Sequence, residues 1–278
     1  MQSFAEVMEF IRPQQIGRYW FVGHSPEPQT RIFGGQVLAQ ALMAAYNTVD
    51  ESLVAHSLHG YFLRPGDPNE SIELEVDPIR DGRSFCTRRV VARQHGNAIF
   101  NASISFQISE AGVSHQQDAP NVASPEKLLA DAEDSDAINA HWPILKVFHT
   151  DRVTTVSQIN RPQPPVHSTW YRGCGGLSQN IRDQQAGLAL ISDFSLLGTA
   201  HLPHSTPDIN SNFINASLDH AIWFHAPIPD PDDYFLYHCD SPWAGGARGF
   251  NRGSFWSRDG RLIASTAQEG LMRPKTSS

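Results

Sequence analysis

The chain is poor in cysteine and lacks long apolar runs. Its 278 residues include three cysteines, Cys86, Cys174 and Cys239, which lie far apart. That number and spacing fit neither a disulfide framework nor a metal site, and favour a reducing compartment. We find no run of about 18 apolar residues and therefore expect no membrane span. The N-terminus does not resemble a secretory signal, and residues 274–278 do not resemble a peroxisomal address. We expect a cytoplasmic protein.

Positive charge is also scarce. The chain has 21 lysines and arginines against 29 aspartates and glutamates, a formal net charge of −8. Such a balance gives no general attraction to nucleic acid or to an anionic membrane, so neither is an expected partner. An anionic small molecule would need a local basic patch. With 40% hydrophobic and 18% charged residues, the composition is that of a globular protein with a substantial core.

Two common hydrolase signatures are missing. There is no His-Glu-x-x-His zinc motif, although the chain has 13 histidines, and we expect no metal. Ser217 is not surrounded by a Gly-x-Ser-x-Gly elbow, which argues against a serine nucleophile. Asp219 and His220 invite comparison with an acid–base pair. Adjacent strand residues point to opposite faces, however, which argues against shared work.

What the chain does contain is an internal repeat. An apolar helical stretch occurs in each half, at Gly35–Ala45 and Ala186–Leu197. Each is followed by a strand with a shared Ser-Leu pair, at His56–Phe62 and Ala216–Phe224. Later, alternating segments are separated by turn dipeptides, His95-Gly96 in the first half and Asp259-Gly260 in the second. Such dipeptides predict β-hairpins.

The repeat predicts an α+β fold built from two similar units. A helix that is apolar on nearly every face must be surrounded, and a curved antiparallel sheet would surround it. Two such sheets, each wrapped round a central helix, could join edge to edge and so hide their edges. We predict an N-terminal unit over residues 1–111, a linker over 112–160 and a C-terminal unit over 161–278.

Three polar residues of the second half stand where apolar ones would be expected. Asp193 lies inside the apolar helical stretch, where a buried carboxylate is costly unless donors bind it. Ser217 opens the following strand, and Gln268 shares a strand face with Leu262, Ala264 and Thr266. The repeat partners in the first half are Gln40, Ser57 and Ile104, which include no carboxylate. We therefore predict one acid–base site per chain.

Several linked segments resemble the acyl-CoA thioesterase II family. They extend from about Gly17 to Arg273 and comprise Phe33–Ala41, His56–Gly66, Arg80–Phe85, Ser192–Phe194, Ser217–His220 and Thr266–Gly270. The resemblance implies a double hotdog fold and hydrolysis of fatty acyl-CoA to free acid and CoA, without a metal or organic cofactor. It also implies a homodimer or higher homo-oligomer.

By motif, the resemblance assigns the site to Asp193, Ser217 and Gln268, which would together orient a water molecule. Some members of the family carry threonine in place of Ser217. The backbone N–H groups of Gly34 and Gly35, at the start of a helix, are candidates for stabilising the oxyanion. The phosphates of CoA require basic side chains, for which the candidates are Arg64, Arg80, Arg83 and Arg88.

Two other functions remain open at this point. A hotdog-fold enoyl-CoA hydratase or dehydratase would add or remove water without releasing CoA. A non-catalytic acyl-CoA-binding protein would keep the fold and pocket but would not need Asp193. Release of free thiol distinguishes the thioesterase from the other two, and addition of water to an enoyl-CoA distinguishes the hydratase from the carrier.

Overall fold

The described residues form one antiparallel sheet of thirteen strands. The computed structural model describes residues 3–26, 31–131, 145–149, 162–173, 176–204 and 212–275. The strands of the first half are β1 (Gln14–Gly17), β2 (Trp20–Gly23), β3 (Leu53–Phe62), β4 (Ile72–Asp81), β5 (Phe85–Gln94) and β6 (Asn97–Ile108). Those of the second half are β7 (Leu145–His149), β8 (Val166–Gly173), β9 (Phe213–Ser217), β10 (Asp219–Phe224), β11 (Phe235–Gly245), β12 (Arg248–Ser257) and β13 (Leu262–Pro274).

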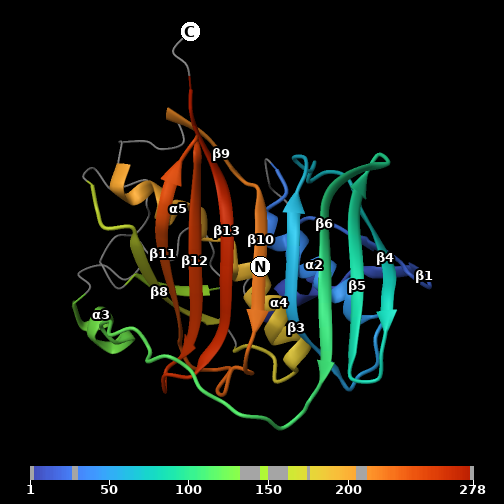
Figure 1. Ribbon diagram of the computed structural model, residues 1–278, viewed down its shortest axis with the longest axis horizontal. Helices are drawn as coiled ribbons and strands as arrows, with labels where there is room; N and C mark the ends of the chain where they lie inside the picture. The colour runs from blue at the N-terminus through green and yellow to red at the C-terminus, as the bar shows by residue number, and fades with distance from the viewer. Residues whose placement is uncertain are drawn as a thin grey trace.

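The two halves meet at a seam between β3 and β10. The strand order is β1-β2-β4-β5-β6-β3-β10-β13-β12-β11-β8-β7, with β9 paired to β13 (Figure 1). The order β4-β5-β6-β3 on one side of the seam is matched by β11-β12-β13-β10 on the other. His59 pairs with Ala221, and Ser57 with Trp223, across the seam. Each half-sheet thereby covers the other's inner edge, and the predicted edge-to-edge joining is confirmed.

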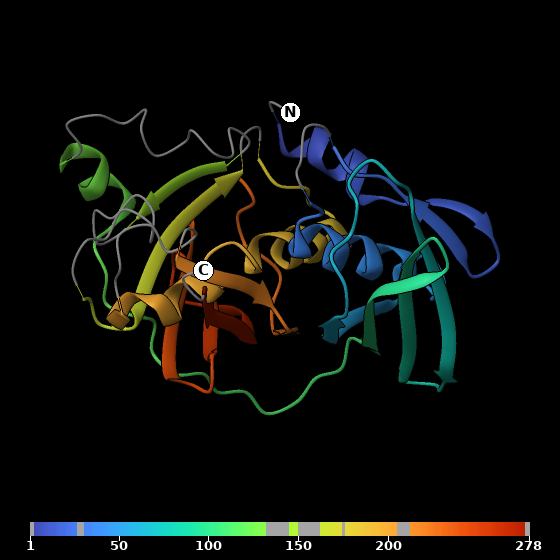
Figure 2. The same cartoon turned by 90° about the horizontal axis from the view of Figure 1, so that it is seen from above.

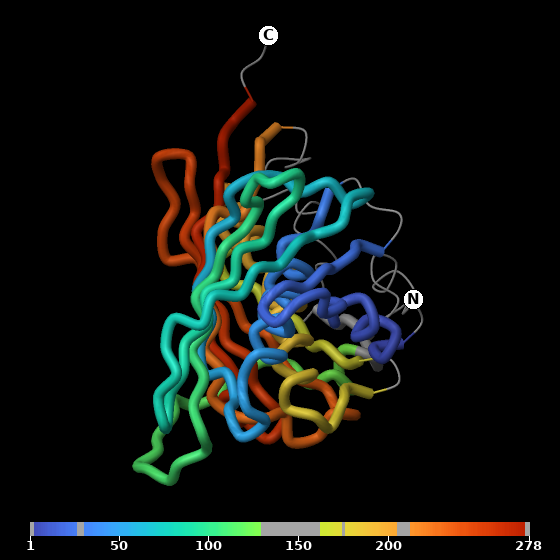
Figure 3. Tube along the Cα trace, turned by 90° about the vertical axis from the view of Figure 1, so that its right-hand side faces the viewer, coloured from blue at the N-terminus to red at the C-terminus, as the bar shows by residue number. Residues whose placement is uncertain are grey.

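Helices cover one face of this sheet. They are α1 (Phe4–Ile11), α2 (Gly34–Tyr46), α4 (Ile181–Ser192), α5 (Leu196–His201) and a 3₁₀ turn, η2 (Leu202–His204). A further helix, α3 (Pro125–Asp131), belongs to the segment that crosses the outer face. The two central helices, α2 and α4, lie side by side against the concave face of the sheet (Figures 2 and 3). Every residue of α2 from Gly35 to Tyr46 is buried. This arrangement is the double hotdog fold.

The close approach of α2 to α4 depends on glycine. A Cβ atom on Gly35 would lie 2.2 Å from the carbonyl oxygen of Leu190, a backbone atom that has little room to move. A Cβ on Gly34 would lie 2.5 Å from Oδ2 of Asp193. The start of α2 therefore touches the end of α4, and this contact brings the two halves together at one point.

The predicted helix over Ala186–Leu197 is wrong in extent. Helix α4 ends at Ser192, Asp193 is its C-cap with φ −88° and ψ −2°, and α5 begins only at Leu196. The Ser192 hydroxyl donates to the carbonyl of Ala189 and so occupies an acceptor of the last turn. Because the helix stops here, the carboxylate of Asp193 turns towards α2 rather than lying among apolar helical neighbours.

The predicted strand over Ala216–Phe224 is also interrupted. It is divided at Leu218 into β9 and β10, and Ser217 ends β9 rather than opening a strand. Both parts pair with β13, and the Leu218 N–H donates to the carbonyl of Glu269 at 2.9 Å. The interruption occurs at the end of β3, where the N–H of Phe62 donates to the Leu218 carbonyl at 3.0 Å.

Both predicted hairpins are confirmed. His95 and Gly96 adopt positive φ angles of 48° and 75° between β5 and β6. Gly260 has a φ of 83° in the turn between β12 and β13. Positive φ is the conformation that hairpin turns of this kind require and that glycine accepts without strain.

The segment predicted as a linker contributes to the second half. It contains α3 and the strand β7, which pairs with β8. Its first part crosses the outer face of the sheet and covers a small apolar cluster of Trp170, Leu236 and Trp256. Trp170 Nε1 donates to the carbonyl of Ala123 at 2.9 Å. We retain the division at 1–111, 112–160 and 161–278 as a proposal.

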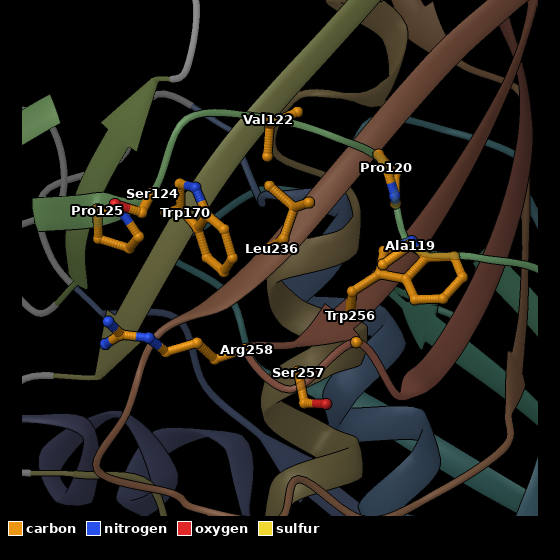
Figure 4. Close-up of a pocket in the computed structure, with 11 residues that line it drawn as sticks. Ala119, Pro120, Val122, Ser124, Pro125, Trp170, Leu236, Trp256, Ser257 and Arg258 are labelled. Atoms are coloured by element: carbon orange, nitrogen blue, oxygen red, sulfur yellow. The ribbon is translucent and has the colours of Figure 1, made fainter. Parts of the chain in front are cut away.

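A pocket lies beneath this crossing segment (Figure 4). Its walls come from the crossing segment on one side and from the outer face of the second half-sheet on the other, and it is lined by Ala119, Pro120, Val122, Ser124, Pro125, Trp170, Leu236, Trp256, Ser257, Arg258 and Gly260. None of the residues predicted for the site is among them.

Two further features bear on where the protein resides: its helices and its cysteines. Within the described ranges, no helix has the length and apolar character needed to cross a membrane. Cys86 and Cys239 are free thiols buried in the core, and Cys174 lies outside the described residues. The short N-terminal elements α1, β1 and β2 were not predicted from the sequence.

Candidate active site

Asp193 lies where α4 ends and α2 begins. Its Oδ2 accepts a hydrogen bond from the backbone N–H of Gly35 at 3.1 Å. Its Oδ1 accepts from the Gln268 amide at 2.6 Å and from the Ser217 hydroxyl at 3.2 Å. The three donors belong to α2, β13 and β9. The structure therefore brings together all three residues predicted as catalytic.

Gln268 and Ser217 reach Asp193 because of their strand positions. Gln268 is 1% exposed and points inward from β13, like Ala264 and Thr266. Leu262, predicted on the same face, packs instead against the outer cluster of Trp170, Leu236 and Trp256, because the register shifts between Ala264 and Leu262. Ser217 stands at the interruption between β9 and β10, where Gly270 of β13 is its partner. The first half has no equivalent acid–base site among the described residues. Gln40, the repeat partner of Asp193, carries no charge and donates to the backbone carbonyls of Phe10 and His24.

Burial is the largest influence on the charge of Asp193. The pKa of Asp193 is raised from 3.8 to about 6, because the loss of solvent outweighs the hydrogen bonds from Gln268, Ser217 and Gly35, which lower it. The positive charge of Arg31 also lowers the pKa of Asp193. A carboxylate with a pKa near 6 is ionised at neutral pH yet basic enough to accept a proton.

A buried histidine completes the site. His220 is 1% exposed, and its Nδ1 lies 3.0 Å from Nε2 of Gln268 while its Nε2 lies 2.8 Å from the hydroxyl of Ser192. Burial lowers the pKa of His220 to about 3, so its ring is neutral. Asp219 has a different partner, the backbone N–H of Glu269. The two neighbours thus face different groups, as strand alternation predicts.

Gly34 and Gly35 lie at the site, but the N–H of Gly35 is bound to Asp193. Gly34 occupies the first turn of α2, where backbone N–H groups have no acceptor within the helix. Its N–H points in the same general direction as the positive end of the helix dipole. Of the two predicted oxyanion donors, Gly34 is the one not already used by Asp193.

The predicted phosphate-binding arginines have different surroundings. Arg88 is 4% exposed, and its five N–H groups bind Thr48, Arg80, Thr87 and Asp81. It therefore supports the fold and has no donor left for a phosphate. Exposed Arg64 follows the end of β3, where Phe62 lies against Gly34.

Arg80 and Arg83 lie at the far end of the first half-sheet. Arg80 lies near the end of β4, and Arg83 lies in the turn that leads to β5. Phe85, the first residue of β5, pairs with Gln107, which in turn pairs with Val54 near the start of β3. The site lies at the other end of β3. A ten-residue strand is about 30 Å long, so these arginines are not part of the site's immediate surroundings.

No group of three or more histidine, cysteine or carboxylate side chains suited to a metal ion occurs in the described part of the chain. The residues around Asp193 are one carboxylate, hydroxyls, an amide and a neutral imidazole. Their chemistry is that of proton transfer and hydrogen bonding.

The fold is that of the double-hotdog enzymes, and comparison with known proteins identifies the family within that class. Residues 24–107 match a model described as "Acyl-CoA thioesterase N-terminal domain", and residues 148–271 match one described as "Acyl-CoA thioesterase". The chain belongs to the acyl-CoA thioesterase family and is a thioester hydrolase.

Individual relatives are similar to this chain over almost its whole length. The sequence is 40% identical to mouse acyl-coenzyme A thioesterase 8, covering 93% of this chain and 84% of the relative. It is 36% identical to acyl-CoA thioesterase 2 of Haemophilus influenzae, covering 96% of both. A crystal structure of an acyl-CoA thioesterase II from Mycobacterium marinum matches with a TM-score of 0.82 and 34% identity, covering 97% and 99% of the two chains.

Proposed function

We propose that the enzyme hydrolyses fatty acyl-CoA to free fatty acid and CoA by direct attack of a water molecule oriented by Asp193, Ser217 and Gln268. The observation that carries the proposal is the convergence of three donors, from three separate elements, on one partly buried carboxylate. Such a carboxylate is held in place and partly desolvated while still open to a water molecule, which is what a positioned general base requires.

The chemistry needs one base and one oxyanion donor. Asp193 accepts a proton as the water oxygen attacks the thioester carbonyl carbon. The carbon–sulfur bond then breaks, and the CoA thiolate leaves and takes up the proton. No covalent enzyme intermediate is formed, in keeping with the absence of a nucleophile elbow at Ser217.

Binding of the substrate uses the contact between α2 and α4. The thioester carbonyl oxygen would lie near the N–H of Gly34, where the helix dipole stabilises developing negative charge. Arg64 is our candidate for the CoA phosphates, because it is exposed and close to this end of β3.

The test is product analysis with ¹⁸O-labelled water. Wild-type enzyme given palmitoyl-CoA should release one free thiol per acid, and single-turnover acid should carry one ¹⁸O atom. With a 2-enoyl-CoA, release of CoA supports hydrolysis. Water addition with the thioester intact would support the hydratase, and stoichiometric binding without any free thiol would support a carrier.

Location and assembly complete the proposal. We place the enzyme in the cytoplasm, a reducing compartment that suits the free thiols Cys86 and Cys239. We further propose a homodimer or higher homo-oligomer, for which the exposed aromatic side chains Tyr61, Trp223 and Trp243 on the sheet offer apolar surface. Sedimentation equilibrium tests the assembly, and a monomer at all concentrations would contradict it.

A further inference from the structure

We propose that His220 is a positioning residue that sets the orientation of the Gln268 amide and thereby the acceptor that Gln268 presents to the attacking water. The inference rests on the proposed function and adds a residue to it. It follows from counting the hydrogens that each group of the network can donate.

Ser192 has a single hydroxyl hydrogen to donate. Its hydroxyl donates to the carbonyl of Ala189 at 2.9 Å, and this uses its one hydrogen. At the contact of 2.8 Å with His220 Nε2, the Ser192 oxygen must therefore accept, and the histidine must carry its proton on Nε2. A neutral imidazole has a single ring proton. Nδ1 of His220 is consequently an acceptor.

An acceptor at Nδ1 determines how Gln268 is oriented. The Gln268 amide nitrogen has two hydrogens: one goes to Nδ1 of His220 at 3.0 Å, and the other to Oδ1 of Asp193 at 2.6 Å. Rotating the amide by 180° would place its oxygen against two acceptors, one of them a carboxylate. Both neighbours therefore select the same orientation, and His220 does so whether or not Asp193 is ionised.

The selected orientation leaves the amide oxygen free. Oε1 of Gln268 is buried and has no hydrogen-bond partner among the described residues. Leaving a buried acceptor unpaired is costly, which points to a partner that arrives with the substrate. A water molecule next to Asp193 has two hydrogens. Asp193 takes one of them, and Gln268 Oε1 accepts the other.

The imidazole itself is held firmly. His220 lies on β10, Ser192 ends α4, and the Ser192 carbonyl accepts from the Tyr237 hydroxyl at 2.9 Å. Thr266 of β13 contacts the same hydroxyl at 2.9 Å. The network ties the end of α4 to the strands beneath it, so that both the ring and the residue before Asp193 are fixed.

His220 does not act by changing charge. The polar groups facing it are the Ser192 hydroxyl of α4 and the Gln268 amide of β13, both neutral. The groups facing Asp193 are the Gly35 N–H, Ser217, Gln268 and the charge of Arg31. Between pH 5 and 9, Asp193 is thus the group of this network whose titration controls activity.

Three substitutions test the inference in the full-length enzyme. His220→Asn keeps an acceptor near the position of Nδ1, His220→Gln keeps a polar atom near Nε2 but none at Nδ1, and His220→Leu removes both. We expect kcat to fall about 10- to 100-fold in the Leu and Gln variants, with KM within about threefold of wild type. The Asn variant should recover at least about fivefold of that loss.

The pH profile supplies a readout that loss of stability alone would not change. The hydrogen bond from Gln268 lowers the pKa of Asp193, so a misoriented amide lets that pKa rise. The acidic limb of kcat/KM should move to higher pH in the Gln and Leu variants and stay near the wild-type position in the Asn variant. Thermal melting confirms that each variant is folded, and the Asn–Gln comparison stands if the Leu variant does not fold.

The outcomes separate this inference from the proposed function. Equal kcat in the Asn and Gln variants, or an unshifted acidic limb in both, would overturn the role of His220. If wild type hydrolyses acyl-CoA and Asp193→Asn does not, the proposed function would stand despite that failure. If Asp193→Asn were fully active, the proposed function would fail whatever the His220 variants did.

Discussion

At the scale of single residues, Asp193 shows how hydrogen bonds stabilise a carboxylate that is costly to bury. Burying a carboxylate without partners costs several kcal/mol, and the hydrogen bonds from Gly35, Ser217 and Gln268 offset part of this cost. They do not offset all of it, because the pKa of Asp193 remains raised to about 6. The residual imbalance is what makes the group a useful base at neutral pH.

Activity should depend on a hydroxyl at position 217 rather than on whether serine or threonine supplies it. Removing it in Ser217→Ala takes one donor from Asp193 and should lower kcat about 10- to 100-fold. Ser217→Thr retains a hydroxyl on a strand position that accepts β-branched residues, and should stay within about fivefold of wild type. Steady-state thiol release measures both, and equal losses in the two variants would contradict the assignment.

Two arginines should give opposite phenotypes. Arg88→Ala removes a buried cation whose N–H groups are all bonded, and should lower the free energy of unfolding by about 2–4 kcal/mol while KM stays unchanged. Arg64→Ala should leave stability within about 0.5 kcal/mol and raise KM for acyl-CoA. Denaturant titration and steady-state kinetics provide the two readouts. A raised KM for folded Arg88→Ala would contradict this division.

Sequence reasoning identified the residues that break an apolar pattern. Asp193 and Gln268 could be predicted because each is polar at a position where its neighbours or repeat partner are apolar, whereas Ser217, whose repeat partner Ser57 is the same residue, was assigned by resemblance to the family. His220 was visible too, but its partner Ser192 lies 28 residues away on a helix end. Without the contact between α4 and β10, nothing in the sequence distinguishes it from other strand histidines.

At the scale of elements, the site depends on how closely α2 meets α4. Gly34→Ala would place a Cβ 2.5 Å from Oδ2 of Asp193, a side-chain atom that can be displaced. We expect this variant to fold, with kcat lowered about 100-fold because the carboxylate is moved. Gly112→Ala, at an open position with no atom within 4 Å, is the matched control.

Gly35→Ala should act differently, because its Cβ would lie 2.2 Å from the Leu190 carbonyl oxygen. Backbone has little freedom to yield, so we expect destabilisation of about 2 kcal/mol or more together with loss of activity. Thermal melts alongside thiol release compare the three glycine variants. A Gly34→Ala enzyme with wild-type kcat would contradict the geometry at the start of α2.

The elements that were predicted are those with strong local signals. The run of small and apolar residues at 35–45 predicted α2, and the turn dipeptides predicted both hairpins. The ends of α4 and β9 were missed because long-range partners determine them: Gly35 binds the residue after α4, and Glu269 binds Leu218. Strand β7 was missed because its place at the edge of the sheet is set by β8.

At the scale of the whole molecule, the two halves share a core. One hydrophobic cluster contains Leu38 and Leu58 from the first half together with Leu190 and Ile222 from the second. With the continuous ladder between β3 and β10, this predicts a single cooperative unfolding transition rather than one per half. Differential scanning calorimetry should give equal calorimetric and van't Hoff enthalpies. Two resolved transitions would contradict a shared core.

The most direct test of the account is the pH dependence of kcat/KM for wild type and Asp193→Asn. Asp193 is ionised above its pKa of about 6 and protonated below it, so wild-type activity should fall as the pH drops through 6. Asn keeps the shape but accepts no proton, and should lose about 1,000-fold or more at pH 7.5 together with that acidic limb. An Asn variant with wild-type activity and the same limb would contradict water activation by Asp193.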